Sequence, residues 1–441
     1  MLFNSYTFLF VFLPVCIFGF LLTYKRSSQN KILFWLTACS LFFYSYEHPS
    51  YFFLIFFSII FNYFVGSHLQ DHANKKLLII GIITNLMLLA YFKYMNFFTS
   101  EILSIFNNSN SIKLDIVLPI GISFYTFQSI TYLVDSYKQL LKNKNFLRFA
   151  LYITFFPQLI AGPIVHYSTV SKQFKSLKDN FHTENFIIGL TIFSFGLFKK
   201  VVIADTFGEK AHAFHQGVLL GSDPSFFTAW FGMFFYTIQI YFDFSGYSDM
   251  AVGLGRLFGI KLPINFWSPY KSTSIIDFWK RWHITLSTFL RDYLYIPLGG
   301  NRVGPIKRYL NLLITMLLGG LWHGAGWTFI IWGGLHGCYL MINHFFRYIN
   351  IFKFIPLPKY ISIRLGHILT FLAVIFAWVF FSAANVENAF SIANGMLGLN
   401  GIIIPSKIAN LLGSNGEQIF ALFFIKTQQY VEFVSKIKQP I

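Results

Sequence analysis

The sequence predicts an all-α integral membrane protein that crosses the bilayer many times. Hydrophobic residue types make up 55% of its 441 residues and charged residues 12%, about half the charged share of an average soluble domain. A chain of this length with so few charges cannot cover its own surface in water. The aromatic content of 21% excludes a disordered chain. Apolar segments close to the ~20 residues of a spanning helix follow one another between short polar loops.

The first apolar segment, Tyr6–Tyr24, is predicted to be a retained helix and not a signal peptide. No Lys or Arg precedes it, Lys25 and Arg26 follow it directly, and it contains no small-residue cleavage motif. Further apolar segments follow at 32–46, 51–66, 77–97 and 116–134.

Basic residues alternate between the loops, which predicts how the helices are oriented. The loops at 25–31, 75–76 and 138–148 carry Lys and Arg, whereas the loop at 47–48 carries neither. Because cytoplasmic loops are rich in Lys and Arg, the basic loops are predicted to be cytoplasmic and the N-terminus to lie outside. The net charge of +17 agrees with the same rule. We expect no nucleic-acid partner, since no basic stripe interleaves with exposed aromatic residues.

The segment at 149–165 breaks this alternation, because it reads as another span but is followed by a stretch that is again basic. A re-entrant segment would explain the pattern. Pro157, Gly162 and Pro163 favour it, since broken backbone at membrane depth is tolerated where protein or a cavity surrounds it. An ordinary kinked helix is the alternative.

Residues 261–308 form the least membrane-like internal stretch, with eight Lys or Arg residues and two Asp residues. The mixture of basic residues with Trp and Tyr predicts short amphipathic helices at the cytoplasmic interface. We expect Lys280, Arg281 and Arg291 to form a basic face at the entrance for an anionic donor such as a nucleotide-tailed thioester. Contact with anionic lipid headgroups is the alternative.

Apolar segments at 309–332, 334–347 and 362–383, and a weaker one near the end of the chain, complete the series. The prediction is about eleven transmembrane helices with additional re-entrant and interfacial helices. We expect one membrane domain over 1–441. Its parts are N-terminal peripheral helices at 1–115, a catalytic core at 116–345 and C-terminal helices at 346–441. No internal repeat is visible, which argues against the transporter folds that are built from repeats.

His323 is the strongest candidate for a catalytic residue. It lies about fifteen residues past Arg308, so at 1.5 Å per residue it is ~20 Å from the cytoplasmic edge. Ionisable groups at this depth are costly and commonly functional. A buried neutral histidine can act as a general base; a histidine hydrogen-bonded across two helices is the alternative. The flanking glycines that would let a helix or a ligand approach are Gly319, Gly320, Gly324 and Gly326.

Other polar residues predict a wet cavity within the membrane. His336 is a second polar partner for His323, and His283 would line an entrance unless it is only an interfacial amphipathic residue. Polar residues around 239–249 interrupt an apolar span and would form cavity walls or hydrogen bonds between helices. The predicted cavity residues are Gln239, Asp243, Ser245, Tyr247, Trp322 and His336.

The sequence indicates neither a metal site nor a bound cofactor. The chain contains no H-E-x-x-H and no C-x-x-C pair, and it has no P-loop, GxGxxG or GxSxG motif. We therefore expect no bound metal and no bound cofactor.

Long motifs across most of the chain resemble one family. The run from IYFDFSGYSDM through DFWKRWHITLSTFLRDYLYIPLGGNRVG, followed by NLLITMLLGGLWHGAGWTFIIWGGLHG, resembles the membrane-bound O-acyltransferase family. Within the family, it is most similar to the bacterial branch that acetylates alginate, peptidoglycan and similar surface polysaccharides. Upstream, LPIGISFYTFQSITYLVDSYK and FFPQLIAGPIVHYSTV are similar to the same branch.

The resemblance implies that His323 is the catalytic histidine and that His283 is a second site residue with a supporting role. It also implies a central tunnel through the membrane, in which a cytosolic acyl thioester meets an acceptor reached from the outer side. The expected reaction is proton removal from an acceptor hydroxyl by His323 while the hydroxyl oxygen attacks the thioester carbonyl.

We therefore expect an O-acyltransferase of the bacterial cytoplasmic (inner) membrane that passes an acetyl group toward a cell-surface or secreted polysaccharide. The donor would be acetyl-CoA or another acyl thioester, and the resemblance implies a separate periplasmic acetyltransferase as partner. D-alanylation of teichoic acid, and a non-catalytic polysaccharide or lipid channel or flippase, are the alternatives. The tail after residue 415 is more broken than the resemblance predicts, so we expect the C-terminal helices to be truncated.

Overall fold

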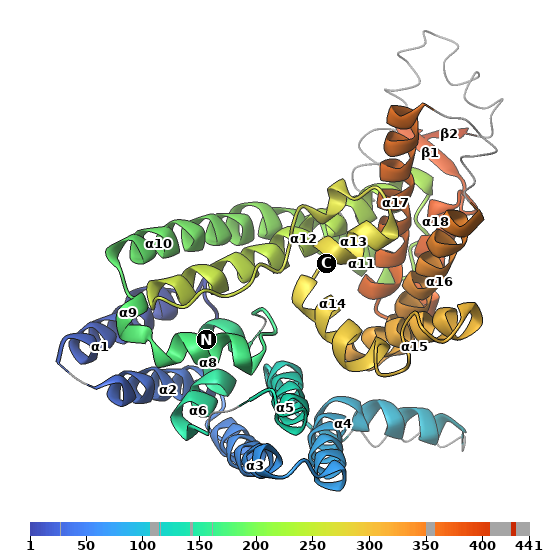
Figure 1. Cartoon of the computed structure of the whole chain (residues 1–441). Coiled ribbons are helices and arrows are strands. Elements are labelled where there is room, and N and C mark those ends of the chain that lie inside the picture. The colour runs from blue at the N-terminus through green and yellow to red at the C-terminus, as the bar shows by residue number, and fades with distance from the viewer. Residues whose placement is uncertain are drawn as a thin grey trace. The chain divides into compact units, whose positions relative to one another are not determined.

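A computed structural model describes residues 1–26, 28–105, 114, 116–141, 144–160, 162–349, 358–405 and 425–428. Almost all of the described secondary structure is helical (Figure 1). The chain forms two compact units. The first contains Met1–Phe198, Ser245–Phe266 and His283–Phe289, and the second contains Lys199–Phe244, Trp267–Trp282 and Leu290–Ile441.

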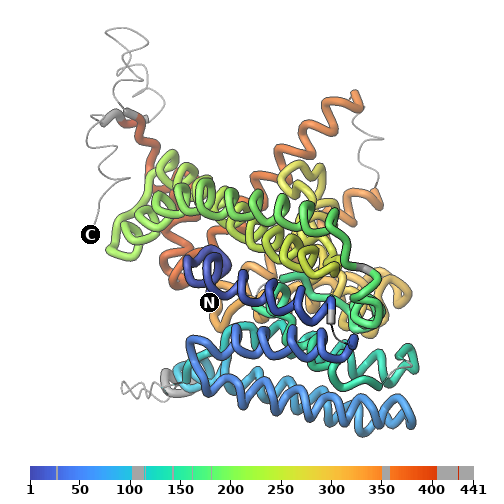
Figure 2. The backbone as a smooth tube through the Cα atoms, turned by 90° about the vertical axis from the view of Figure 1, so that its left-hand side faces the viewer, coloured from blue at the N-terminus to red at the C-terminus, as the bar shows by residue number. Residues whose placement is uncertain are grey.

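The first unit is built from the N-terminal helices, the end of α12 and most of α14. Its elements are η1 (Phe8–Phe12), α1 (Leu13–Arg26), α2 (Gln29–Ser45), α3 (Tyr51–Asp71), α4 (Lys75–Ile105), α5 (Ile122–Tyr137), α6 (Phe146–Thr154), α7 (Phe156–Leu159), α8 (Tyr167–Lys175), α9 (Leu177–Asn180), α10 (Thr183–Phe198), the end of α12 (Phe226–Leu257) and most of α14 (Ile284–Leu290). Helices α1, α2 and α3 follow one another as antiparallel neighbours (Figure 2).

The second unit holds the C-terminal helices and a short parallel pair of strands. Its elements are η2 (Lys199–Ala204), α11 (Asp205–Leu219), the first part of α12, η3 (Pro269–Lys271), α13 (Ile275–Arg281), η4 (Arg291–Tyr295), α15 (Pro305–His323), α16 (Trp327–Ile349), α17 (Lys359–Ser382), α18 (Val386–Met396), β1 (Ile402–Pro405) and β2 (Ile425–Gln428). Ile402 pairs with Ile425 in the strand register.

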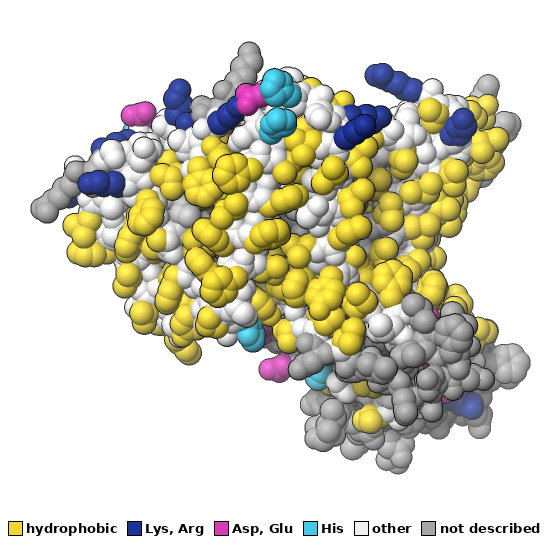
Figure 3. All heavy atoms as spheres, turned by 90° about the horizontal axis from the view of Figure 1, so that it is seen from below, with side chains coloured by type: hydrophobic (Ala, Val, Ile, Leu, Met, Phe, Trp, Pro, Cys, Tyr) yellow, Lys and Arg dark blue, Asp and Glu magenta, His cyan; other side chains and the backbone are white. Residues whose placement is uncertain are grey.

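Five helical segments of the described chain are long and apolar enough to cross a membrane. They are Phe8–Lys25, Tyr51–Asp71, Lys75–Glu101, Thr183–Leu219 and Lys359–Ser382. Four of them coincide with predicted segments, whereas Thr183–Leu219 is a further one. The total of eleven spans stays a prediction, and so does the division at residues 115 and 345. Hydrophobic side chains are spread widely over the described surface in Figure 3, as expected where lipid is the solvent.

The backbone interruption predicted within residues 149–165 is confirmed, and the choice between a re-entrant segment and a kinked helix stays a prediction. The chain forms two short helices, α6 and α7, separated at Phe155. Ser40 Oγ accepts a hydrogen bond from the backbone N–H of Phe156 at 3.2 Å, and Gln158 donates to the carbonyl of Tyr152 at 2.6 Å. These side chains satisfy backbone groups at the ends of α6 and α7 that the interruption leaves without a partner inside the helix, so the broken segment is tolerated inside the protein.

The prediction of short helices within residues 261–308 is also confirmed, since η3, α13, α14 and η4 each span three to seven residues. Ser274 caps α13 by accepting a hydrogen bond from the backbone N–H of Asp277 at 3.1 Å. The predicted truncation of the C-terminal helices concerns a tail that lies mostly outside the described residues.

Helices α15 and α16 approach each other through glycines. A Cβ added to Gly320 would overlap the carbonyl oxygen of Phe329, and one added to Gly333 would overlap that of Met316. Backbones this close leave no room for side chains at the crossing. The predicted close approach at Gly320 is therefore confirmed, and it places the end of α15 against the start of α16.

Candidate active site

His323 is the last residue of α15, where Gly324 extends the chain away from the helix. Its imidazole lies among three aromatic rings of the second unit, with centroid distances of 4.9 Å to Trp322, 5.1 Å to Trp332 and 5.2 Å to Phe381. The residue is half-buried and not fully buried as predicted, because the helix ends there. The ring is thus held in place by packing but remains accessible.

Trp332 links His323 to the second predicted histidine of this segment. Its ring lies edge-on to His323 at 5.1 Å and to His336 at 4.9 Å. His336 is 0% exposed and also contacts Phe278 and Trp279. Neither ring nitrogen of His336 has a hydrogen-bond partner among the described residues. The environment of His336 is therefore an aromatic core and not an open wall of the predicted cavity.

His283 belongs to the first unit, where it is 1% exposed. The basic sequence around His283 predicted that it lines an open entrance. Its burial in the first unit does not agree with that prediction. Its Nδ1 lies 3.2 Å from Oδ1 of Asn265. The backbone φ of His283 is 44°, in the left-handed region that residues with a Cβ atom rarely adopt. Such strain persists only where surrounding contacts impose it, and it is common at functional sites.

Asn265 imposes this conformation through both its backbone and its side chain. Its carbonyl oxygen accepts from the backbone N–H of Ile284 at 2.9 Å. Its Oδ1 accepts from the backbone N–H of Thr285 at 3.2 Å and from the Thr285 hydroxyl at 3.0 Å. The Thr285 hydroxyl in turn accepts from the backbone N–H of Ile164 at 3.0 Å. These bonds join the stretch that follows α7 to the start of α14.

The same bonds define the protonation of the neutral His283 ring. A backbone N–H can only donate, so the bond from Thr285 identifies the Asn265 atom as the oxygen. His283 must then carry its proton on Nδ1, which leaves the lone pair on Nε2. Burial lowers the pKa of His283 to about 3, because the charged imidazolium is disfavoured away from water. The ring is therefore neutral at physiological pH.

The predicted polar residues of α12 fall in both units. Gln239 and Asp243 lie in the second, and Ser245 and Tyr247 in the first. Asp243 Oδ1 pairs with Lys200 Nζ at 2.6 Å, whereas Ser245 Oγ is buried with no hydrogen-bond partner among the described residues. Tyr247 stacks on the ring of Phe3, 4.7 Å away. These residues do not form one cluster within either unit.

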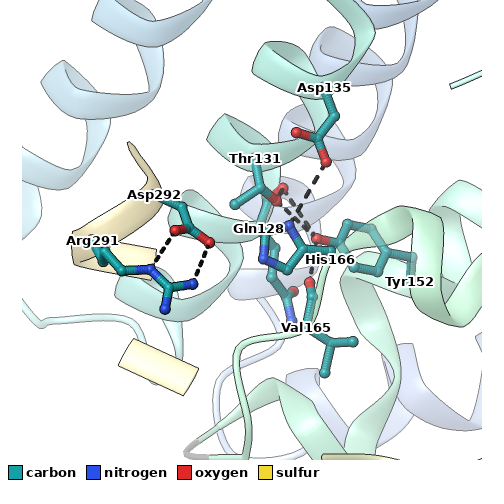
Figure 4. Close-up of polar contacts among 8 residues, drawn as sticks. All are labelled: Gln128, Thr131, Asp135, Tyr152, Val165, His166, Arg291 and Asp292. Carbon is teal, nitrogen blue, oxygen red and sulfur yellow. Dashed lines mark hydrogen bonds and ion pairs between the residues drawn. The ribbon is translucent and has the colours of Figure 1, made fainter. Parts of the chain in front are cut away.

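The predicted basic face consists of side chains of the second unit that differ in pairing. Arg281 Nε bonds Asp277 Oδ1 at 2.9 Å, and Arg291 bonds both carboxylate oxygens of Asp292, at 2.6 and 3.1 Å (Figure 4). The carboxylate of Asp292 raises the pKa of Arg291. Lys280 is exposed. Two of the three charges are therefore partly neutralised by their neighbours.

Sequence reasoning missed a polar cluster in the first unit. Tyr152 donates to the carbonyl of Val165 at 2.8 Å, and the next residue, His166, lies with Nδ1 3.7 Å from Oδ2 of Asp135 (Figure 4). Asp135 and His166 both occur in motifs that carry the family resemblance, so the polar residues of those motifs were the available signal. Asn265, in the motif PINFWSPY, was also missed, and its place in a family motif was again the available signal.

Lys200, which the sequence analysis did not single out, lies within a candidate span and bonds both Asp243 and Asp205, at 2.6 and 2.8 Å.

His68 and His72 have the i, i+4 spacing of a metal-binding pair. Across the described part of the chain, however, no three His, Cys, Asp or Glu side chains are grouped so that they could hold a metal ion.

Comparison with known proteins gives the family. The model of the membrane-bound O-acyltransferase family matches residues 67–387. The chain is 45% identical over 434 residues to a peptidoglycan O-acetyltransferase of Helicobacter pylori, covering 91% of this chain and 81% of the relative. It is 42% identical over 407 residues to a probable alginate O-acetylase of Pseudomonas aeruginosa, covering 90% and 75%. A teichoic acid D-alanyltransferase of Streptococcus thermophilus is 31% identical over 238 residues, covering 51% and 56%.

These matches extend over both compact units and include the segments that carry His283 and His323. The chain therefore belongs to the membrane-bound O-acyltransferase family and is a membrane acyltransferase.

Proposed function

We propose that the chain passes an acetyl group from a cytosolic thioester across the cytoplasmic (inner) membrane of a bacterium for O-acetylation of a cell-surface or secreted polysaccharide. The observation that carries the proposal is the similarity, over nine-tenths of the chain, to relatives named as O-acetyltransferases of peptidoglycan and alginate. The similarity to a D-alanyltransferase covers about half of the chain, so an acetyl group is favoured over alanine.

His323 is the proposed general base. One ring nitrogen takes the proton of an acceptor hydroxyl while the hydroxyl oxygen attacks the thioester carbonyl. The tetrahedral intermediate collapses, the carbon–sulfur bond breaks, and the thiolate leaves and takes up the proton. The half-buried imidazole among Trp322, Trp332 and Phe381 supports this role. A ring that is fixed by packing loses little freedom when it enters the reactive geometry.

His283 is the proposed second residue of the site. Its protonated Nδ1 is bound by Asn265, so Nε2 is the nitrogen that can accept a hydrogen bond from the donor or the acceptor. We propose a positioning role and not a second base, because burial lowers the pKa of His283 to about 3 and makes it a poor proton acceptor.

The proposed reaction needs an acyl donor, a protein that receives the acetyl group and a path through the membrane. Acetyl-CoA is the proposed donor, with a carrier-bound acyl group as the competing possibility. A periplasmic enzyme would receive the acetyl group and complete the transfer to the polymer. Gln239, Asp243, Ser245 and Tyr247 are proposed to face the transfer path, and Lys280 is proposed to contact the anionic donor at the cytoplasmic side.

The test is His323→Ala in a bacterial strain that lacks its own copy of this protein. Ester-linked acetate on isolated peptidoglycan and on exopolysaccharide is measured, and membrane abundance is followed by immunoblot. We expect acetate to disappear from one polymer while the variant protein remains at its normal abundance in the membrane. His344→Ala, a half-buried histidine on α16 outside the aromatic cluster, is the matched control. Wild-type acetate levels in His323→Ala would contradict the assignment of the base.

Donor identity is tested separately, with purified protein and radiolabelled acetyl-CoA or an acyl carrier protein bearing acetyl or D-alanyl groups. Release of free CoA that depends on His323 and on an added glycan supports the proposal. Turnover with D-alanyl carrier alone would favour teichoic acid D-alanylation. Polymer export that continues in His323→Ala, with no acyl transfer by the wild-type protein, would favour a channel or flippase.

A further inference from the structure

A groove of about 640 Å³ lies within the second unit, between α16 and α17 and beside the start of α13. Along α16 its wall carries Tyr339, Asn343 and Arg347. These residues are four apart, so they form one stripe along the helix with a rise of about 6 Å between neighbours. The stripe places a phenol, an amide and a guanidinium in succession, from the inner end of the groove to the end of the helix.

The opposite wall is made of small side chains. Ser362, Gly366, Thr370 and Ala373 lie on one face of α17, a helix that is itself a candidate membrane span. The helix is kept close to the start of α13, because a Cβ at Gly366 would lie 2.7 Å from the carbonyl oxygen of Thr273. Small residues in a membrane helix either receive another helix or leave space for a ligand. Here they face the groove.

The rims of the groove are apolar and exposed. Ile342 and Phe346 on α16, and Ile363 and Leu369 on α17, all line it with exposed side chains. In a membrane protein such side chains face acyl chains. The groove therefore opens toward the bilayer, and a lipid can enter it without crossing a polar surface.

The polar stripe offers N–H donors to ligand oxygens at this depth, while the oxygen of Asn343 itself lacks a donor. Asn343 Oδ1 is buried and has no hydrogen-bond partner among the described residues, which is costly in an apolar medium. Rotation of the amide would direct its N–H₂ group to a ligand oxygen and its oxygen to a donor. Arg347, one turn further along α16, is the cation of the groove, and its described lining includes no Asp or Glu.

We propose that this groove binds a membrane glycerophospholipid. Its phosphate would bond Arg347, its ester oxygens would bond Asn343 one turn deeper, and an acyl chain would lie along Gly366, Thr370 and Ala373. The order of phosphate, ester and hydrocarbon in the lipid matches the order of these residues along the groove. The inner end is Tyr339, whose ring contacts His336 at 5.7 Å. The lipid would thus support the aromatic cluster that also holds His323. Binding is independent of the proposed reaction.

The test uses the full-length protein in detergent after delipidation, with native mass spectrometry during titration with 1-palmitoyl-2-oleoyl-phosphatidylglycerol. We expect one tightly bound lipid per chain. Arg347→Gln should weaken it about tenfold, since it removes a charge-assisted hydrogen bond. Ala373→Trp should eliminate lipid binding, because the indole ring would fill the part of the groove beside Ala373. Arg364→Gln is the matched control, because Arg364 is an exposed cation on α17 outside the groove lining. The Arg364→Gln variant should bind the lipid as tightly as the wild-type protein does.

Equal weakening by Arg347→Gln and Arg364→Gln would overturn the proposal, because it would indicate general attraction of anionic lipid. Retained binding in Ala373→Trp would overturn it too. Displacement of the lipid by acetyl-CoA in an Arg347-dependent manner would assign the groove to the soluble donor instead.

A second measurement covers variants that fail to fold. Wild-type protein is irradiated with phosphatidylglycerol that carries a diazirine on one acyl chain, and labelled peptides are mapped. Labels concentrated in peptides with residues 339–347 and 362–373 support the proposal, and labels confined to other helices overturn it. Because no turnover is measured, a failure of the acyltransferase proposal would not affect this outcome.

Discussion

Asn265 and His283 are joined by a hydrogen bond of 3.2 Å between Oδ1 and Nδ1, although the two residues are eighteen positions apart in the chain. Asn265 also binds the backbone of Ile284 and Thr285. Asn265 therefore holds the left-handed backbone of His283 through its carbonyl and its side chain, and its Oδ1 determines the nitrogen that carries the His283 proton. A residue that acts in this way is a positioning residue for the proposed site.

The first prediction concerns Asn265→Ala. The change leaves the N–H groups of His283 and Thr285 buried without an acceptor, and each such loss costs about 1–3 kcal/mol. We expect a lower melting temperature in detergent and a strong decrease in ester acetate on the target polymer. Asn265→Asp is the matched variant, because it keeps an oxygen in the same place. Full acetate levels in Asn265→Ala at wild-type abundance would contradict the positioning role.

The second prediction concerns pH. His283 has a pKa of about 3 in the folded protein, compared with about 6.5 in an unfolded chain. Between these two pKa values the unfolded state binds more protons at His283 than the folded state does. The contribution of His283 to folding stability is therefore complete above about pH 6.5 and is lost as the pH falls. The loss approaches ~1.4 kcal/mol per pH unit.

Melting temperatures measured from pH 8 to pH 5 test this dependence. We expect the decrease toward pH 5 to be smaller in His283→Gln, which cannot acquire the proton. Identical slopes for the two proteins would show that His283 does not titrate on unfolding.

The third prediction concerns the crossing of α15 and α16. In Gly320→Ala the new methyl group would overlap the carbonyl oxygen of Phe329, and overpacking of this kind costs about 1–3 kcal/mol. Gly334→Ala is the matched control on α16, because its Cβ would lie 3.6 Å from Leu317 Cδ2 in ordinary contact. We expect only Gly320→Ala to lower the melting temperature. Similar values for both variants would mean that the helices separate easily.

The fourth prediction concerns His336→Phe. His336 is fully buried among aromatic rings, and its ring nitrogens have no hydrogen-bond partner in the described part of the chain. Replacing an unsatisfied polar ring with an apolar ring of similar shape is neutral or stabilising. We expect an unchanged or higher melting temperature. A clear decrease would indicate that His336 makes polar contacts in the membrane, and loss of acetate without loss of stability would return it to the transfer path.

Much of this protein could be predicted from local sequence features. The membrane class follows from composition, because lipid accepts the apolar surface that water does not. Pro157, Gly162 and Pro163 predicted the interruption between α6 and α7. Gly320 beside His323 predicted a close helix contact. Long motifs identified the family, which the comparisons confirm. Each of these signals lies in a contiguous stretch of chain and so needs no knowledge of packing.

The tertiary structure decided what depends on contacts between distant segments. The burial of His283, its bond to Asn265 and its neutral state follow from neighbours that the chain brings together only on folding. The same is true of His336, whose sequence suggested a cavity wall but whose position is an aromatic core. Helix periodicity states which residues share a face, but not which partner covers it. For that physical reason the sequence determined the membrane class and the family and singled out His323 as a candidate, and packing decided the environment of each histidine.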